Sequence, residues 1–334
     1  LIAFEIGPTI TGLDSALALT DIAARAGAQA IKVQCLMADR LVGDPELTVS
    51  YANADGPATD SMVAILRRRA LTYAEWQTLG RAVRYAGLLF FVTVDFPETL
   101  EWALEAGADS LKVCSGDVTH LGWIEEMAQT GLPIQVDTGN AGIGELEAAV
   151  EACARAGNRD IVIHHCPSGY PARLESINLR VIPTLRRMFP ECVVAFSDHS
   201  VGRDMDLAAV ALGASMVEKT LTLDRRQPGP EHVFSLEPDE AEGFVRAIRE
   251  MEQALGSPRR VLTEAERMAR RGARRSAYLA RDVAEGAIIL ADDLDWRRPG
   301  GGIEPRDADW IVGRAATRNL AVGECVRPSM LANN

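Results

Sequence analysis

The sequence VVAFSDHSVGRD at residues 193–204, followed by MVEKTLTLD at residues 216–224, contains the pattern around which the rest of the chain is organised. Each stretch opens with an apolar, β-branched run and ends in polar residues, and a helix-like segment lies between the two. This order predicts a strand, a helix and a second strand parallel to the first. In parallel α/β folds, ligands bind at the carboxyl ends of the strands, where loops and helix N-termini converge. The polar clusters therefore indicate a functional site.

The same alternation extends over most of the chain. Amphipathic stretches separate the strand-like runs, and many of them end in Ala-Gly or Leu-Gly, a good helix stop. Alternating strands and helices favour parallel pairing through right-handed crossovers, and eight such units predict a closed (β/α)8 barrel. A doubly wound open sheet is the alternative. Eight strands are expected, at residues 1–7, 30–35, 88–94, 110–115, 133–138, 161–166, 193–197 and 216–221.

Two segments interrupt this pattern. Residues 37–61 contain several Asp, Gly and Pro residues and little periodicity, which predicts a long loop over the barrel mouth after the second strand. Loops of this kind commonly close over a substrate. Residues 259–274 are rich in arginine and are interpreted as a linker that follows a barrel domain at residues 1–258.

The C-terminal residues change in character. Short β-like runs at 277–279, 287–290 and 320–322, separated by Gly-containing turns, predict a small all-β domain at residues 275–334. A module of this size is marginal as an independent core, so we expect it to dock onto another surface.

Composition excludes several classes of function. The formal net charge of −12 argues against a general nucleic-acid or anionic-membrane binder, because these need a basic surface. An anionic small-molecule substrate must therefore be held by a local group of cations. No run approaches the ~18 apolar residues of a membrane span, and we expect a cytoplasmic protein. The six cysteines form no C-x-x-C pair, which argues against a thiolate zinc site.

Two strand lysines are the strongest chemical signal. Lys32 and Lys112 are flanked by apolar residues, and a lysine in a buried strand needs an anion or a carboxylate beside it. With the hydroxyl groups of Thr93 and Ser197 and the turn at Ser115, they would form a cradle for a phosphate or carboxylate ligand. The alternative is that both lysines pair internally with the acidic residues Glu5 and Glu218.

His199 lies in a polar Ser-Asp-His-Ser turn, and its sequence context leaves three roles open. It can ligate a metal, act as a general acid or base, or donate a hydrogen bond to another ligand group. His164 and His165 are adjacent in a strand, so their side chains face opposite ways and only one can enter the barrel mouth.

The strand-end motifs resemble those of the sialic acid synthase family. They are FEIG at residues 4–7, AIKVQ at 30–34, LKVCSGDVT at 111–119, HCPSGYP at 165–171, FSDHSVG at 196–202, EKTLTLDR at 218–225, GPEHVFSLEP at 229–238 and RRPGGGI at 297–303. The resemblance implies a (β/α)8 barrel followed by a C-terminal antifreeze-like (SAF) domain. It also implies condensation of phosphoenolpyruvate with an aldose, assisted by Mn²⁺ or Mg²⁺. Such enzymes are homodimers in which each SAF domain caps the partner's barrel.

Site residues are carried over from the family position by position. The resemblance assigns phosphoenolpyruvate binding to Lys32, Thr93, Lys112, Ser115 and Ser197. Glu5 matches an acidic residue near the reacting groups, His199 a metal ligand and Tyr170 a substrate-pocket residue. Arg298 matches the SAF arginine that enters the partner's active site.

The sequence also departs from the family pattern. Thr220 stands where the family has its second metal histidine, and a hydroxyl is a weaker ligand than imidazole. Asp137 and Ser168 replace a serine and an asparagine near the phosphate, and Thr9 and Ile10 replace an Asn-His pair. Two explanations are open. Either a divalent ion is bound by His199 together with Asp137 or Glu218, or the protein binds a ligand other than ordinary phosphoenolpyruvate.

We therefore expect a divergent transferase that joins phosphoenolpyruvate, or a close analogue, to an aldehyde acceptor in a specialised sugar or natural-product pathway. The alternatives are a lyase, isomerase or transferase that uses the same scaffold without metal, and an inactive ligand-binding homologue.

Overall fold

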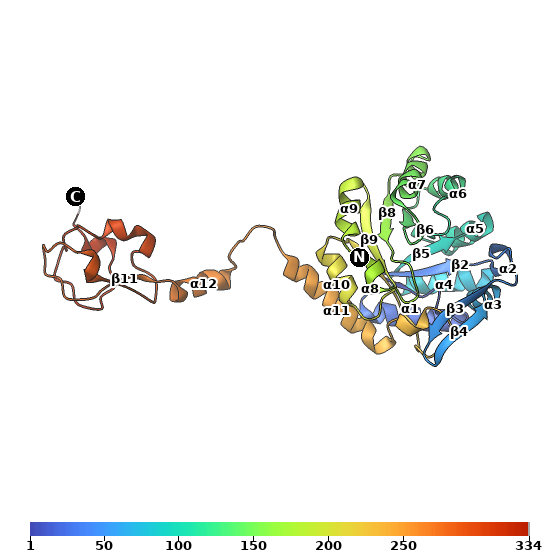
Figure 1. Ribbon diagram of the computed structural model, residues 1–334, viewed down its shortest axis with the longest axis horizontal. Helices are drawn as coiled ribbons and strands as arrows, with labels where there is room; N and C mark the ends of the chain where they lie inside the picture. The colour runs from blue at the N-terminus through green and yellow to red at the C-terminus, as the bar shows by residue number, and fades with distance from the viewer. Residues whose placement is uncertain (333–334) are drawn as a thin grey trace. The chain divides into compact units, whose positions relative to one another are not determined.

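The computed structural model describes residues 1–332 and comprises two compact units (Figure 1). The first unit is Leu1–Gly256, and the second begins at Ser257. We describe each unit separately.

The first unit is a closed barrel of parallel strands surrounded by helices (Figure 1). The strands are hydrogen-bonded in the order β1-β10-β9-β8-β7-β6-β5-β2, which closes the sheet without an edge. The predicted (β/α)8 barrel is therefore confirmed and an open sheet is excluded. The barrel strands are β1 Ile2–Glu5, β2 Ala30–Cys35, β5 Leu89–Val94, β6 Ser110–Val113, β7 Ile134–Asp137, β8 Ile161–His165, β9 Val193–Asp198 and β10 Met216–Thr220.

The outer helices form because each presents an apolar stripe to the strands. In α1, Leu13–Ala26, the residues Ala16, Leu19 and Ala23 are fully buried, and Gly27 ends the helix with φ 85°. The other helices that follow barrel strands are α4 Tyr73–Tyr85, α5 Pro97–Ala106, α6 Leu121–Ala128, α7 Ile143–Arg155, α8 Leu174–Ile177, α9 Val181–Met188, α10 Asp204–Ala211 and α11 Pro238–Leu255.

The segment after β2 differs from the sequence prediction. The expectation of a long loop at residues 37–61 is wrong, because this segment contains a short helix and an antiparallel hairpin. These elements are α2 Ala38–Leu41, β3 Thr48–Asn53 and β4 Gly56–Ser61, and α3 Met62–Arg69 follows directly. In β3, Val49 and Tyr51 alternate with Ser50 and Ala52, but Tyr51 is the one hairpin residue that is buried and β4 has no apolar alternation, so the strand signal is short and weak.

The two-residue period of the strands determines which side chains enter the barrel. One inner cluster is apolar and contains Ala3, Ala30, Phe91, Ala195 and Met216. The residues two positions further along the same strands are polar and buried: Glu5, Lys32, Thr93, Ser197 and Glu218. The barrel thus has an apolar interior layer below a polar layer nearer the carboxyl ends of its strands.

The second unit has little regular structure. Its strands β11 Ser276–Leu279 and β12 Leu294–Arg297 pair antiparallel, and isolated bridges such as Val283–Leu320 and Ile288–Ala315 add further pairing. Its 3-10 helices are η2 Ala291–Asp293, η3 Pro305–Trp310 and η4 Pro328–Met330.

A core of its own supports this unit. Ala277, Leu279, Ile289 and Val326 are buried in one cluster. The helix α12 Glu264–Ala273 lies within residues 259–274, which the sequence analysis interpreted as a linker. Within residues 1–332, no helix is both long and apolar enough to cross a membrane.

Candidate active site at the carboxyl ends of the barrel strands

Lys112 is at the centre of an ion-pair network inside the barrel. Its ammonium group lies 2.5 Å from Glu218 Oε1 and 3.1 Å from Asp137 Oδ2. Ser197 Oγ donates a hydrogen bond of 2.9 Å to the same Glu218 oxygen. Burial alone would raise the pKa of both carboxyls, but the attraction of Lys112 outweighs it and holds the pKa of Glu218 and of Asp137 below their usual values. Both carboxylates are therefore ionised at neutral pH.

Lys32 forms a second buried pair, with Glu5. The two residues are direct register partners on β2 and β1, which explains why their side chains meet inside the barrel. Burial raises the pKa of Glu5 to about 7 even though Lys32 opposes the shift. Glu5 can therefore both accept and donate a proton near neutral pH.

The alternative that both lysines pair internally with Glu5 and Glu218 thus describes this structure. It does not exclude a ligand, because the polar layer has unused hydrogen-bonding capacity. Within the described part of the chain, five buried atoms in this layer or at the neighbouring strand ends have no hydrogen-bond partner: Thr93 Oγ1, Asp95 Oδ2, Asp137 Oδ1, His164 Nδ1 and Glu218 Oε2. Buried polar atoms in native proteins are nearly always satisfied, so such a group indicates a place where water or a ligand binds.

The adjacent histidines behave as the strand alternation predicts. His164 Nε2 donates to Gln135 Oε1 at 2.9 Å, and burial and the neighbouring Lys112 lower the pKa of His164 to about 4. It is therefore a neutral hydrogen-bonding group. His165 Nε2 instead donates to the carbonyl of Ile177 at 2.6 Å, and its ring packs against Phe196.

His199 lies in an aromatic group above the polar layer. Its ring centroid is 4.8 Å from that of Tyr170 and 5.8 Å from that of Phe234, and Tyr170 and Phe234 stack at 6.2 Å. His199 Nδ1 is 3.3 Å from the carbonyl oxygen of Pro167. A donor hydrogen on Nδ1 would leave Nε2 as the free acceptor of the ring.

A fully buried cluster of charged residues stabilises the turn that contains His199. Lys219 Nζ donates to Asp198 and, at 2.6 Å, to the carbonyl of Ser200, and it lies 3.6 Å from Asp206. Asp198 in turn accepts from both the backbone and the hydroxyl of Ser200. Because these residues flank His199 in the chain, the cluster holds its backbone in one position.

The remaining predicted residues lie in separate places. Ser115 accepts a hydrogen bond of 3.0 Å from Asn140, and Ser168 donates to the carbonyl of Gly139. These contacts place both serines where the loops after β6, β7 and β8 meet. Arg298 belongs to the second unit. Its expected approach to a barrel stays a prediction.

The expected role of His199 as a metal ligand stays a prediction. Thr220 is buried at the end of β10, and it stands beside Glu5 in the register. Within residues 1–332, one group of three acidic or His/Cys ligand atoms is close enough together to share an ion, and it does not include His199.

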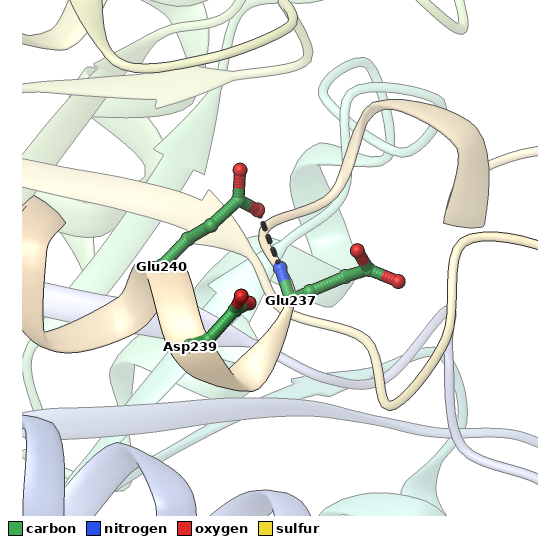
Figure 2. A group of neighbouring side chains, drawn as sticks. All are labelled: Glu237, Asp239 and Glu240. Atoms are coloured by element: carbon green, nitrogen blue, oxygen red, sulfur yellow. Dashed lines mark hydrogen bonds between the residues drawn. The ribbon is translucent and has the colours of Figure 1, made fainter.

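That group consists of Glu237, Asp239 and Glu240 at the start of α11 (Figure 2). Glu240 accepts from the backbone of Glu237 at 2.9 Å, and Arg225 bonds to Glu240. Glu237 and Glu240 therefore serve as helix-terminus hydrogen-bond acceptors and ion-pair partners.

Sequence reasoning missed Arg69 and Glu231. Both are buried beside the barrel mouth, and with Gln34, Thr93 and Asp95 they line a cavity of about 280 Å³. A weak signal existed: Arg69 lies four residues after the apolar Ile65, so the two share a helix face.

Comparisons with known proteins agree with this architecture. The NeuB family model matches residues 19–260, and the SAF domain model matches residues 274–332. N,N'-diacetyllegionaminic acid synthase from Legionella pneumophila is 31% identical over 93% of this chain and 88% of its own length. Spore coat polysaccharide biosynthesis protein SpsE from Bacillus subtilis is 33% identical over 92% of this chain and 87% of its own. The structure of N-acetylneuraminic acid synthetase from Leptospira borgpetersenii, in complex with citrate, matches with a TM-score of 0.71 at 29% identity. That match covers 80% of this chain and 89% of the other.

Proposed function

The chain belongs to the NeuB family, and on this basis we propose that it is an enzyme that condenses phosphoenolpyruvate, or a close analogue, with an aldehyde or aldose acceptor. The resemblance to sialic acid synthases inferred from the strand-end motifs is confirmed. Relatives of this chain are named as sugar-acid synthases, which supports a role in carbohydrate biosynthesis. The reaction joins the methylene carbon of phosphoenolpyruvate to the aldehyde carbon of the acceptor, one water adds to C2 of the donor, and inorganic phosphate leaves.

The observation that carries the proposal is the polar layer around Lys32 and Lys112. Two buried ammonium groups at the carboxyl ends of barrel strands suit a donor that carries a carboxylate and a phosphate. In this structure their partners are carboxylates, so an anionic donor replaces the interactions of Lys32 with Glu5 and of Lys112 with Asp137 and Glu218. The displaced carboxylates then need protons or a cation.

Glu5 is suited to this exchange. Its pKa of about 7 means that it takes up a proton easily when a second anion approaches. A protonated Glu5 also donates to the acceptor's carbonyl oxygen as carbon–carbon bond formation turns that oxygen into a hydroxyl. The substrate is then activated by a residue of this chain.

The family's divalent ion fits these residues poorly. Of the family's two metal histidines this chain keeps His199, and Thr220 offers a neutral hydroxyl in place of the second. We propose that the resting affinity for Mn²⁺ or Mg²⁺ is low, since oxygen-rich sites with few protein ligands bind such ions weakly.

The proposal is tested by measuring phosphate release from phosphoenolpyruvate over a panel of aldoses, with and without Mn²⁺. We expect release that depends on the acceptor and that Glu5→Gln slows at least about tenfold, because the amide cannot transfer the proton. The assignment would be wrong if the protein did not bind phosphoenolpyruvate. It would also be wrong if phosphate were released at the same rate without any acceptor.

We also propose a homodimer, with the SAF domain and its Arg298 reaching the partner's barrel. The small size of the second unit supports docking onto a larger surface. Light scattering at micromolar concentration tests this, and a monomer would contradict it.

A further inference from the structure

One face of the helix α12 carries four arginines. They are spaced so that their side chains lie on the same side of the helix: Arg267, Arg270, Arg271 and Arg274. Like charges at these spacings repel one another and destabilise a helix. No residue of α12 is buried, so packing inside the protein does not offset the repulsion. The arginine face of α12 is therefore stabilised by anions that bind beside it.

This face forms one wall of a cavity of about 200 Å³ within the second unit. The turn at Gly300 and Gly301 forms another wall, and Arg275 and Glu304 also line the space. The cavity therefore brings five arginines and one carboxylate together.

The turn is held against the helix by backbone hydrogen bonds. The N–H of Gly300 donates to the carbonyl of Arg271 at 2.8 Å. The hydroxyl of the fully buried Ser276 accepts from the next two N–H groups of the turn, each at 3.1 Å. A Cβ on Gly300 would lie 3.1 Å from the carbonyl oxygen of Arg271, so glycine lets the turn approach the helix this closely. The cavity is therefore formed before any ligand binds.

The nearby carboxylates leave a surplus of positive charge in the cavity. Arg267 pairs with a glutamate of its own helix turn at 2.9 Å, and Arg274 pairs with Glu304 at 2.7 Å. In the described part of the chain, the other three arginines of the cavity have no ion pair: Arg270, Arg271 and Arg275. The chain as a whole has a net charge of −12, so this surplus is a local feature. Three uncompensated guanidinium groups around one small space favour an anion.

The kind of cation and the size of the cavity define that anion. All five cations are arginines, whose planar guanidinium groups bind phosphate oxygens through two N–H groups at once. These arginines are exposed, and a single exposed ion pair contributes at most about 1 kcal/mol. A ligand with one charged group would therefore bind weakly, whereas two linked phosphate groups contact several arginines together. A nucleic acid would need an extended basic surface and does not fit a space of this size.

We propose that the cavity between the arginine face of α12 and the turn at Gly300 binds a compact anion with two linked phosphate groups, either inorganic pyrophosphate or the diphosphate of a nucleotide. This site does not depend on the proposed reaction in the barrel. Arginine stays protonated, and Glu304 is held in ion pairs with Arg274 and Arg306, so these groups bind the ligand and do not transfer protons. The ligand offsets the repulsion on α12 and stabilises the helix, which suits an effector.

Calorimetric titration of the full chain in magnesium-free buffer tests the site with inorganic pyrophosphate, orthophosphate and adenosine diphosphate. We expect pyrophosphate to bind at least about tenfold more tightly than orthophosphate. The double variant Arg270→Gln/Arg271→Gln should weaken pyrophosphate binding at least about tenfold, and glutamine keeps a helix propensity close to that of arginine. Tighter binding of adenosine diphosphate than of pyrophosphate identifies a nucleotide as the ligand, and weaker binding identifies free pyrophosphate.

Arg187→Gln is the matched control, because Arg187 is an exposed arginine of α9 with no ion pair in the described part of the chain. Pyrophosphate that binds in the barrel would bind equally to the wild type, the control and the double variant. A loss of binding in the double variant alone therefore reports on this cavity.

Three results would overturn the inference: no binding of pyrophosphate, equally tight binding of orthophosphate, or equal losses in the double variant and the control. If pyrophosphate does not bind and the double variant shifts the protein towards a monomer in light scattering, the arginine face is instead a protein-docking surface. If the double variant fails to fold, Arg271→Lys replaces it. That variant should weaken pyrophosphate binding at least about threefold, because an ammonium group lacks the two-pronged geometry, and an unchanged affinity would contradict the site.

Discussion

The Lys112 network makes a sharp prediction about stability. Lys112→Met removes an ammonium group that lies 2.5 Å from Glu218 and 3.1 Å from Asp137, with all three side chains buried. Removing one member of a buried ion pair typically destabilises a protein by about 3–5 kcal/mol, because the partner charge is left without compensation. We expect a loss of that size in the free energy of unfolding at pH 8.

The loss should depend on pH in a defined direction. In the wild-type protein Lys112 overcomes burial and holds the pKa of Glu218 and of Asp137 low, so their ionised forms contribute stability above the unfolded pKa values. That contribution disappears only as the pH falls through the low folded values. In Lys112→Met, burial raises both pKa values, and the folded protein must then take up protons. The difference in unfolding free energy between the wild type and Lys112→Met should therefore be smaller at pH 5 than at pH 8, by at least about 2 kcal/mol.

The assay is urea-induced unfolding at both pH values, followed by circular dichroism. Arg155→Met is a matched control, because Arg155 pairs with Glu125 at 2.8 Å on the exposed surface. It should cost less than about 1 kcal/mol. Two results would refute the interpretation that these three groups are ionised and compensate one another's charge. One is a loss of unfolding free energy in Lys112→Met that is no larger than in the control, and the other is a loss that does not change with pH.

Three further changes give independent predictions. Thr220→His should raise Mn²⁺ affinity in calorimetry by restoring an imidazole near His199, and a stoichiometric metal already present in the purified wild-type protein would show that Thr220 is not a lost ligand. Asp95 has its pKa raised to about 7 by burial and by Asp117, so its folded form holds a proton that the unfolded chain has released. The free energy of unfolding should therefore fall as the pH rises from about 4 to 7, and this pH dependence should be weaker in Asp95→Asn. An unchanged pH dependence in the variant would mean that another group causes it. Gly302→Ala should destabilise the second unit selectively, because an added Cβ would overlap the carbonyl oxygen of Val326. Equal unfolding midpoints for the variant and the wild type would contradict this.

Much of the barrel follows from sequence because its signals are local. Each strand combines an apolar run with a polar end, and each helix has an apolar stripe, so no long-range information is needed. The hairpin β3–β4 gave only a weak signal, the alternation of Val49 and Tyr51 in β3, since Tyr51 is its one buried residue. Its strands pair with each other and need no apolar alternation to do so.

The site was only partly predictable for a different reason. The polar strand ends identified Lys32 and Lys112, but Lys112 on β6 meets Glu218 on β10 across the closed barrel. No local pattern encodes that contact. Arg69 was hidden because it is the third of three consecutive arginines, of which Arg67 and Arg68 are substantially exposed. Helix geometry turns Arg69 inward, onto the same face as Ile65 and Leu66.

Formation of the carbon–carbon bond can be observed by carbon NMR. Phosphoenolpyruvate labelled with ¹³C at its methylene carbon is incubated with the protein and an N-acetylhexosamine labelled at the aldehyde carbon. We predict a product in which the two labelled carbons show one-bond coupling, formed together with inorganic phosphate. Phosphate release without that coupling, or no product while both substrates are bound, would contradict the assignment of this chain as a condensing enzyme.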